Sequence, residues 1–176
     1  MMKIGSTECQ VIALNSGRCI CLWSNVVITI WNDAPDMSSI RKIEQVRRHL
    51  KRRYPQGTVG LNICMEGMLL PSPKVRKDIG EVVRRNHETV TENVVVLQGA
   101  GFWASSVRAF FSSFTMLLNK ETHKLFDDLS EALLYLKPHF ADKAGTTQEI
   151  ISFVHGLQND MALERRVSSE IALDEV

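Results

Sequence analysis

The sequence predicts an α/β domain in which helices pack on a mixed, mostly parallel sheet of about five strands, with a helical extension at the C-terminus. Three observations carry this prediction. Two strand-like apolar runs follow one another near the N-terminus, over residues 11–23 and 26–31. After them, helical and strand-like patterns alternate up to residue 136. The chain has 176 residues, of which 44% are hydrophobic, so it is long and apolar enough to bury such a core.

The two N-terminal runs are separated only by Ser24 and Asn25, which is the spacing of a two-residue hairpin turn. We therefore expect these two strands to be antiparallel. Each later strand, over residues 59–65, 94–97 and 123–126, follows a helical segment that is long enough for a crossover. Because a crossover brings the chain back to the same end of the sheet, these strands are expected to run parallel.

Local signals place the helices between these strands. The first helix begins after Asp36, a residue type that caps helix N-termini, and its apolar side chains recur at helical spacing up to Leu50. The second begins at Pro73, because proline suits the first helical position, where no N–H donor is needed. The third covers residues 102–118 and is apolar around most of its circumference, and the fourth covers residues 127–136.

The chain changes character after residue 138. Residues 141–147 are polar, which indicates a linker or a domain boundary. The apolar spacing over residues 150–157 predicts one more amphipathic helix, and the polar remainder is expected to be frayed or helical only where it is held. The sequence thus predicts an α/β domain over residues 1–138 and a helical or partly disordered extension over residues 139–176.

The lengths of the apolar runs and the positions of the cysteines indicate the cellular compartment of the protein. No apolar run approaches the ~20 residues that span a bilayer, and the N-terminus lacks the apolar stretch of a signal peptide. We expect a cytoplasmic protein without an integral membrane segment. Three of the four cysteines lie in apolar strand-like runs, so buried, reduced thiols are expected rather than disulfides or a metal site. These cysteines are Cys9, Cys19, Cys21 and Cys64.

A formal net charge of +1 hides an uneven distribution. Residues 41–85 contain twelve basic and four acidic residues, a net charge of +8, which leaves about −7 for the rest of the chain. This layout indicates a surface that faces an acidic partner, a lipid or a nucleic acid, or else ordinary solvated helix faces. The candidates for anion binding are Arg47, Arg48, Lys51, Lys74 and Arg76.

The order of the elements, together with the closing sequence Phe-Asp-Asp-Leu-Ser-Glu-Ala-Leu at residues 126–133, resembles the STAS domain of anti-sigma-factor antagonists and sulfate-transporter tails. The resemblance covers residues 10–136 and implies a non-enzymatic regulatory domain. It also implies a phosphorylated Ser or Thr where the helix after the third strand begins, usually beside an Asp. Ser72 holds that position, but its neighbours are Leu-Pro-Ser-Pro-Lys and the acid is missing. A plain helix cap is the alternative for Ser72.

The third helix carries large rings beside small polar residues. This mixture suits a protein interface, because aromatic residues and arginine contribute most of the binding energy there. The rival interpretation is that the rings complete the core and the serines face water. The interface candidates are Trp103, Val107, Arg108, Phe110, Phe111 and Phe114.

Two functions of different classes follow. The first is a non-enzymatic regulatory or scaffold domain that docks a protein partner or a second copy of itself. The alternative is a domain that binds an anionic small molecule, a lipid head group or a nucleotide, and an apolar cavity beneath Met65, Met68, Leu69 and Leu70 would favour it. No histidine pairs with a nucleophile or has metal-ligand spacing, so we expect no catalysis, no cofactor and no metal. We also expect no nucleic-acid partner.

Overall fold

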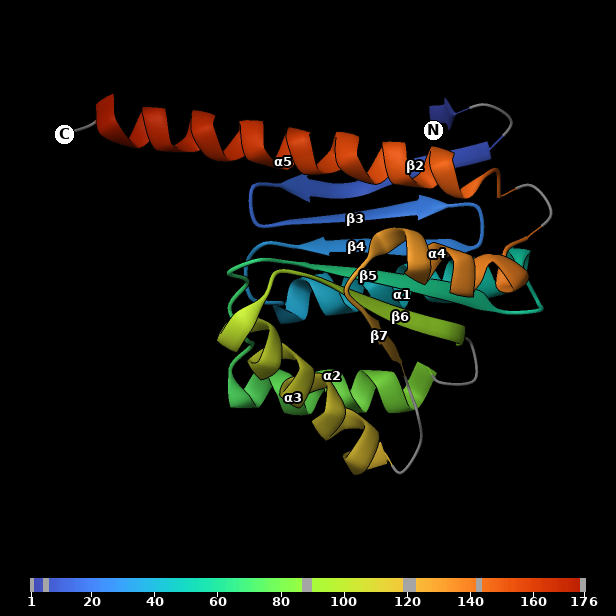
Figure 1. The fold of residues 1–176 in the computed structure, drawn as a ribbon. Coiled ribbons are helices and arrows are strands. Elements are labelled where there is room, and N and C mark those ends of the chain that lie inside the picture. Colours follow the sequence, from blue (N-terminus) through green and yellow to red (C-terminus); the bar gives the residue numbers. More distant parts are fainter. Residues whose placement is uncertain (1, 5–6, 87–89, 119–122, 142–143, 175–176) are drawn as a thin grey trace.

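A computed structural model of the protein describes residues 2–4, 7–86, 90–118, 123–141 and 144–174, except the side chains of residues 2–8, 83, 86, 114–118 and 168–174 (Figure 1). In these ranges seven strands form one sheet, in sequence order: β1 (Met2–Ile4), β2 (Thr7–Asn15), β3 (Arg18–Trp23), β4 (Val26–Trp31), β5 (Thr58–Met65), β6 (Val90–Gln98) and β7 (Lys124–Phe126). The helices are α1 (Met37–Arg53), α2 (Pro73–Asn86), α3 (Gly101–Leu118), α4 (Leu129–Leu136), the short 3₁₀ helix η2 (Lys137–His139) and α5 (Thr147–Asp174).

The α/β class and the mixed sheet are confirmed. Strands β1 to β4 pair antiparallel with their sequence neighbours, and β4 to β7 pair parallel through the helical crossovers α1, α2 and α3. The predicted hairpin at Ser24 and Asn25 joins β3 to β4, with Trp23 opposite Val26. The described sheet is larger than the five strands expected, because its antiparallel part has two further strands.

The prediction of one strand over residues 11–23 is wrong, because Ser16 and Gly17 form a turn inside that run. The side-chain oxygen of Asn15 accepts hydrogen bonds from the backbone N–H groups of Gly17 and Arg18, both at 3.0 Å. An Asn that bonds the backbone just beyond it is a common turn device. The chain therefore reverses after Asn15, and the run becomes the antiparallel pair β2 and β3.

The two faces of the sheet bury different sets of helices. One apolar cluster joins strand residues such as Ile28 and Ile63 to α4 and α5. The other cluster joins strand residues such as Ile20 and Val95 to α1 and α3. Strands β4 and β5 therefore lie under helices on both faces, and nearly all of their residues are buried. This explains why they read as continuous apolar runs rather than as alternating ones.

Helix α5 lies along β2 and β3 and extends past the end of the sheet (Figure 1). Its residues Ile150, Val154 and Met161 are buried in the same cluster as the sheet. The segment before α5 is tied to the β3–β4 turn, because the Asn25 side chain donates to the His139 carbonyl and accepts from the Ala141 N–H, each at 2.9 Å. The extension thus packs on the α/β core, and it is helical for longer than the sequence predicted.

All four cysteines are buried and free, as the sequence predicted. Among the residues described, no group of histidine, cysteine and acidic side chains is placed to hold a metal ion. In the same residues, no helix combines the length and the apolar character that crossing a membrane requires.

Helix α1 begins at Asp36, as predicted from the sequence. The Asp36 carboxylate accepts hydrogen bonds from the Ser39 backbone N–H at 2.7 Å and from the Ser39 hydroxyl at 2.9 Å, and it pairs with Arg18. Partial burial raises the pKa of Asp36, but the Ser39 hydrogen bonds and the Arg18 charge outweigh it, so the pKa lies below its ordinary value. The cap and the ion pair together fix the start of α1 against the β3 end of the sheet.

We predict that Asp36→Ala lowers the free energy of unfolding by about 1 kcal/mol, the usual cost of removing a helix cap. Asp36→Asn keeps a capping oxygen and loses only the charge, so its cost at pH 7 is smaller. Because folding lowers the pKa of Asp36, its negative charge stabilises the folded protein at pH values above the unfolded pKa of about 3.9. This stabilisation is lost as the pH falls through the pKa of Asp36 in the folded protein. Denaturant unfolding at pH 7 and pH 3 measures both effects.

The matched control is Asp160→Asn, which makes the same charge change at an exposed position on α5. It should leave the stability unchanged at both pH values. A cost of Asp36→Asn that is no smaller at pH 3 than at pH 7 would contradict the assignment.

Candidate functional site

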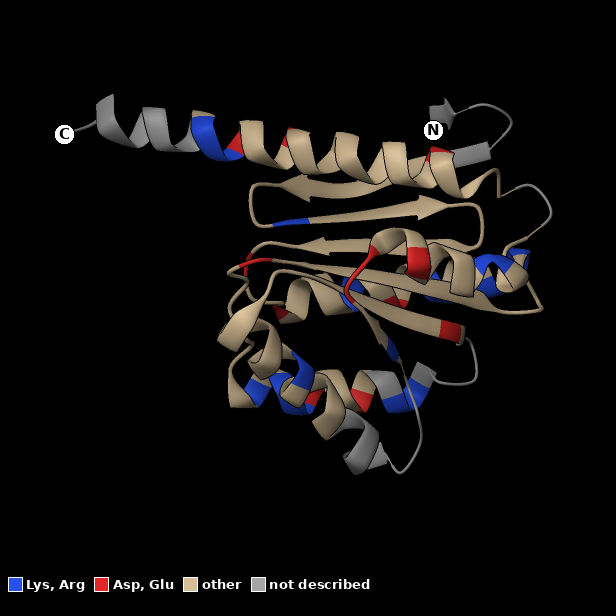
Figure 2. Cartoon of the chain, in the orientation of Figure 1, with Lys and Arg blue, Asp and Glu red and all other residues tan. Residues whose placement is uncertain are grey.

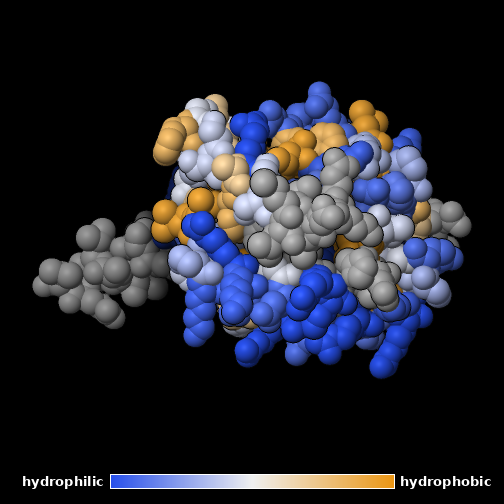
Figure 3. All heavy atoms as spheres, turned by 90° about the horizontal axis from the view of Figure 1, so that it is seen from below, coloured by the Kyte–Doolittle hydropathy of each residue, from blue (hydrophilic) through white to orange (hydrophobic). Residues whose placement is uncertain are grey.

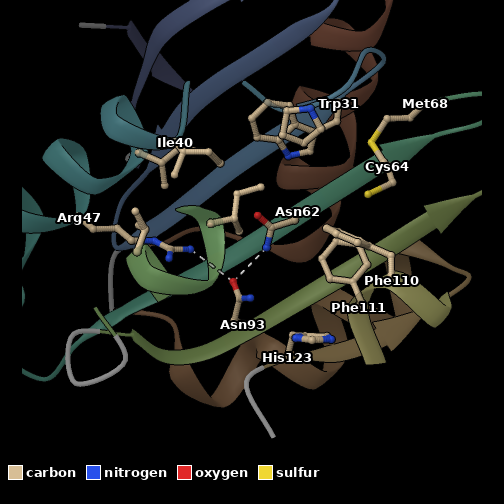
Figure 4. A pocket seen from close by; sticks show the side chains of 14 residues that line it. Trp31, Ile40, Arg47, Asn62, Cys64, Met68, Asn93, Phe110, Phe111 and His123 are labelled. Carbon is tan, nitrogen blue, oxygen red and sulfur yellow. Dashed lines mark hydrogen bonds between the residues drawn. The ribbon is translucent and has the colours of Figure 1, made fainter. Parts of the chain in front are cut away.

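A cavity of about 120 Å³ lies between the parallel part of the sheet and helices α1, α2 and α3 (Figure 4). Met68 is one of its walls, whereas Met65, Leu69 and Leu70, beneath which a cavity would have favoured ligand binding, do not line it. The cavity is mostly apolar, and its polar side chains come from one helix and two neighbouring strands. The apolar walls include Trp31, Ile43, Met68, Val82, Phe110 and Phe111, and the polar wall is formed by Arg47, Asn62 and Asn93.

Arg47 reaches this cavity from α1. The residue as a whole is half-buried, but Nε of its guanidinium is shielded from solvent and has no hydrogen-bond partner. The neighbouring Nη2 donates to Asn93 Oδ1 over a long 3.4 Å. Burial lowers the pKa of Arg47 to about 10, so the group stays protonated at pH 7. No carboxylate of the described residues is paired with it.

A directed chain of hydrogen bonds crosses the sheet toward Arg47. The Trp31 indole N–H donates to Thr29 Oγ1, and the Thr29 hydroxyl donates to Asn62 Oδ1, each at 2.9 Å. The Asn62 amide then donates to Asn93 Oδ1 and to the Val94 carbonyl, both at 2.9 Å. The Val94 carbonyl can only accept, so the Asn62 atom that faces it is the amide nitrogen, and Asn62 Oδ1 must accept from the Thr29 hydroxyl.

This direction decides which groups face the cavity. Asn93 Oδ1 accepts from both Asn62 and Arg47 (Figure 4), so the other end of the Asn93 side chain must be its amide nitrogen, a donor. The acceptor oxygens of Thr29 and Asn62 are occupied within the chain. The polar wall therefore offers hydrogen-bond donors, on Arg47 and Asn93, and a positive charge.

Gly60 makes this arrangement fit. It lies beside Asn93 across the β5–β6 pair, and a Cβ at this position would overlap Asn93 Oδ1 and lie 2.8 Å from Arg47 Nη2. The close approach of both side chains to the strand therefore depends on a residue without a side chain.

Two other lining residues do not neutralise Arg47. Burial raises the pKa of the Cys64 thiol to about 12, so Cys64 stays uncharged at neutral pH. His123 stands edge-on to the Phe111 ring, with ring centroids 5.1 Å apart. Neither side chain supplies a negative charge to the cavity.

Of the predicted anion-binding residues, only Arg47 reaches the cavity. The other four, Arg48, Lys51, Lys74 and Arg76, are exposed on α1 and α2. Lys and Arg gather on these two helices (Figure 2), and the face that includes α2 is largely hydrophilic (Figure 3). Arg48 lies 3.3 Å from Glu44, and Arg76 lies over the Phe110 ring. The basic residues thus form a solvated face and do not converge on one ligand.

Most of the interface candidates on α3 face the core. Val107 and Phe110 are buried, Phe111 is partly buried, and the Trp103 indole donates to the Met68 carbonyl at 2.9 Å. Arg108 pairs with Asp127. The side chain of Phe114 lies outside those described. The described rings among these candidates therefore pack against the core, whereas Phe102 at the start of α3 is 89% exposed.

Ser72 is exposed, and its hydroxyl accepts a hydrogen bond from the Val75 N–H at 3.5 Å, where α2 begins. This contact is that of a helix cap, and Ser72 does not line the cavity. The site residues that the sequence analysis missed are Thr29, Asn62 and Asn93. Asn62 was detectable, since an amide in the middle of a buried apolar strand needs partners.

A larger hollow, of about 680 Å³, lies between α5 and β2 and is lined partly by Val11, Leu14 and Phe153. None of its described lining atoms is a buried polar group without a partner. The cavity at Arg47 is therefore the better candidate for specific binding.

Comparisons of the chain with protein-family models, with curated proteins and with solved structures found no match.

We predict that Arg47→Met raises the free energy of unfolding of the ligand-free protein. Replacing buried ionic groups with apolar side chains of similar volume is often neutral or stabilising by about 1–4 kcal/mol. The stabilisation is expected here because the Arg47 charge has no ionic partner, and Asn93 Oδ1 keeps its bond from Asn62. Urea unfolding of the two proteins measures the difference.

The control is Arg48→Met, which removes the same charge from the next position of α1, where the side chain is exposed. It should change the stability by less than about 0.5 kcal/mol. A loss of stability in Arg47→Met would show that the guanidinium is a structural group of the apo protein.

Proposed function

We propose that the chain is a cytoplasmic, non-enzymatic binding domain that holds a small anionic molecule in the cavity beneath α1, α2 and α3. The observation that carries this proposal is the protonated guanidinium of Arg47, which is buried at the cavity and has no carboxylate partner among the described residues. The four free thiols fit a reducing compartment.

The energetic argument concerns the cost of this charge. Removing an ion from water costs several kcal/mol, and buried charges are normally paired or hydrogen-bonded. Arg47 has one long hydrogen bond to Asn93, which compensates little of that cost. An anion in the cavity would supply the missing partner, in surroundings where charge attraction is stronger than in water.

The shape of the site supports binding rather than catalysis. Small-molecule sites are concave and mostly apolar, with a few polar groups that orient the ligand, and this cavity has that composition. Its anchoring groups are a guanidinium and carboxamides, which hold anions but do not act as nucleophiles. The lining thiol, Cys64, is held in its unreactive neutral form.

The proposal predicts that at least one small anion raises the melting temperature of the protein in a concentration-dependent way. The panel consists of carboxylates, phosphate, sulfate and a sulfonate at constant ionic strength, since screening alone alters stability. Arg47→Met should abolish the shift, and Arg48→Met should retain it. If every anion shifts the three proteins equally, or none shifts the wild type, the proposal is wrong.

The second candidate function is the regulatory docking role that the STAS resemblance implies. Two large apolar side chains support it, because Leu69 is 70% and Phe102 is 89% exposed. The hydrogen bond from Trp103 to the Met68 carbonyl joins the first turn of α3, which carries Phe102, to the loop that carries Leu69. Both side chains lie at the edge of the sheet where α2 and α3 begin. A second copy of the chain would cover them there.

This candidate predicts that the wild type self-associates with rising concentration and that Phe102→Asp makes it monomeric without lowering its melting temperature. The matched control is Leu134→Asp on α4, since Leu134 is also an exposed apolar residue, at 63%. Light scattering after size exclusion measures the mass. A wild type that stays monomeric, or a dimer that both variants break, counts against docking through this edge.

A further inference from the structure

We infer that the anion for this cavity is a monocarboxylate with a short apolar body. The inference rests on the proposed function and specifies the chemical class of its ligand. Three properties of the site lead to it: the charge of the polar wall, the direction of its hydrogen bonds and the size of the cavity.

The charge of the polar wall matches one negative charge. Arg47 is the one cationic side chain among the described lining residues that is buried and unpaired. Its Nε and Nη2 lie on the same edge of the planar guanidinium, and two parallel N–H groups fit the two oxygens of a carboxylate. Nε is shielded as the side chain stands, so binding through both groups includes a small turn of the guanidinium toward the cavity. A doubly charged phosphate would bring a second negative charge into an apolar cavity without a cation to balance it, which is costly.

The hydrogen-bond direction determines the rest of the ligand. The oxygens of Thr29, Asn62 and Asn93 already accept bonds within the polar chain. Asn93 Oδ1 already accepts two hydrogen bonds, so the main acceptor that the polar wall leaves for a ligand hydroxyl or amine is the second lone pair of Asn62 Oδ1, and an unpaired buried donor is costly. The Asn93 amide nitrogen can donate to the second lone pairs of the carboxylate. Apart from the Cys64 thiol and the His123 ring the remaining walls are apolar, so the ligand body that fits most of them is apolar too.

The size of the cavity limits the length of that body. An engineered apolar cavity of roughly 150 Å³ holds benzene, which has six non-hydrogen atoms. The cavity of about 120 Å³ therefore accommodates about five or six such atoms. Propionate and butyrate have this size, acetate leaves the cavity partly empty, and hexanoate exceeds it.

The test is calorimetric titration of the full chain with acetate, propionate, butyrate and hexanoate at constant ionic strength. We expect affinity to rise about fourfold with each methylene from acetate to butyrate, as apolar surface is buried, and to fall at hexanoate. Butyramide has the shape of butyrate without its charge and should bind at least tenfold more weakly. Phosphate, sulfate and succinate test other anion classes in the same buffer.

Two variants separate charge from geometry. Arg47→Lys keeps a positive charge but loses the planar pair of donors, so butyrate affinity should fall about tenfold or more. Arg48→Lys makes the same change on the exposed side of α1 and should leave butyrate affinity unchanged. If Arg47→Lys binds butyrate as well as the wild type does, the two-point contact is wrong.

The outcomes distinguish this inference from the function on which it rests. If phosphate, sulfate or succinate binds more tightly than every monocarboxylate and Arg47→Met abolishes that binding, the ligand class is wrong and the anion-binding function stands. If butyramide binds as tightly as butyrate, the charge has no role and both proposals fall. If no compound in either panel binds, the proposed function fails, and the inference with it.

Discussion

The burial of one guanidinium against the centre of a β-sheet is the constraint on which this structure depends. Arg47 comes close to the β5 and β6 backbone only because Gly60 has no side chain. Its hydrogen-bond acceptor, Asn93, is oriented by Asn62, which is oriented in turn by Thr29 and Trp31. A buried charge is costly unless an opposite charge or hydrogen bonds compensate it. This cost is the reason for proposing that these residues form one side of a binding site.

The two faces of the sheet differ in what they bury. Because β4 to β7 follow one another in order with parallel pairing, their crossover helices α1, α2 and α3 lie over the same face. That face holds the cavity and its polar wall. On the other face, α4 and α5 close a continuous apolar cluster to which all but one of the cysteines belong. Stability can therefore come from one face while the other retains a costly buried charge.

Local signals were enough to predict most elements. Asp36 caps α1, Pro73 begins α2, and Asp128 caps α4 through the Glu131 N–H at 2.9 Å. One error arose where a local turn signal was read as part of an apolar run, and one local helix start was not recognised. Asn15 and its turn split the first predicted strand, and Thr146 with Glu149 forms reciprocal capping bonds that start the long helix α5.

The sequence by itself determined the α/β class, the parallel pairing of the later strands and the presence of many basic residues on two helices. These features depend on periodicity, caps and composition, which neighbouring residues define. Only the tertiary structure decided that Arg47 enters a cavity while Arg48 is exposed, and that Asn62 and Asn93 meet there. Adjacent positions of a helix point about 100° apart, and partners in a sheet are distant in sequence, so no local pattern selects which charge is buried.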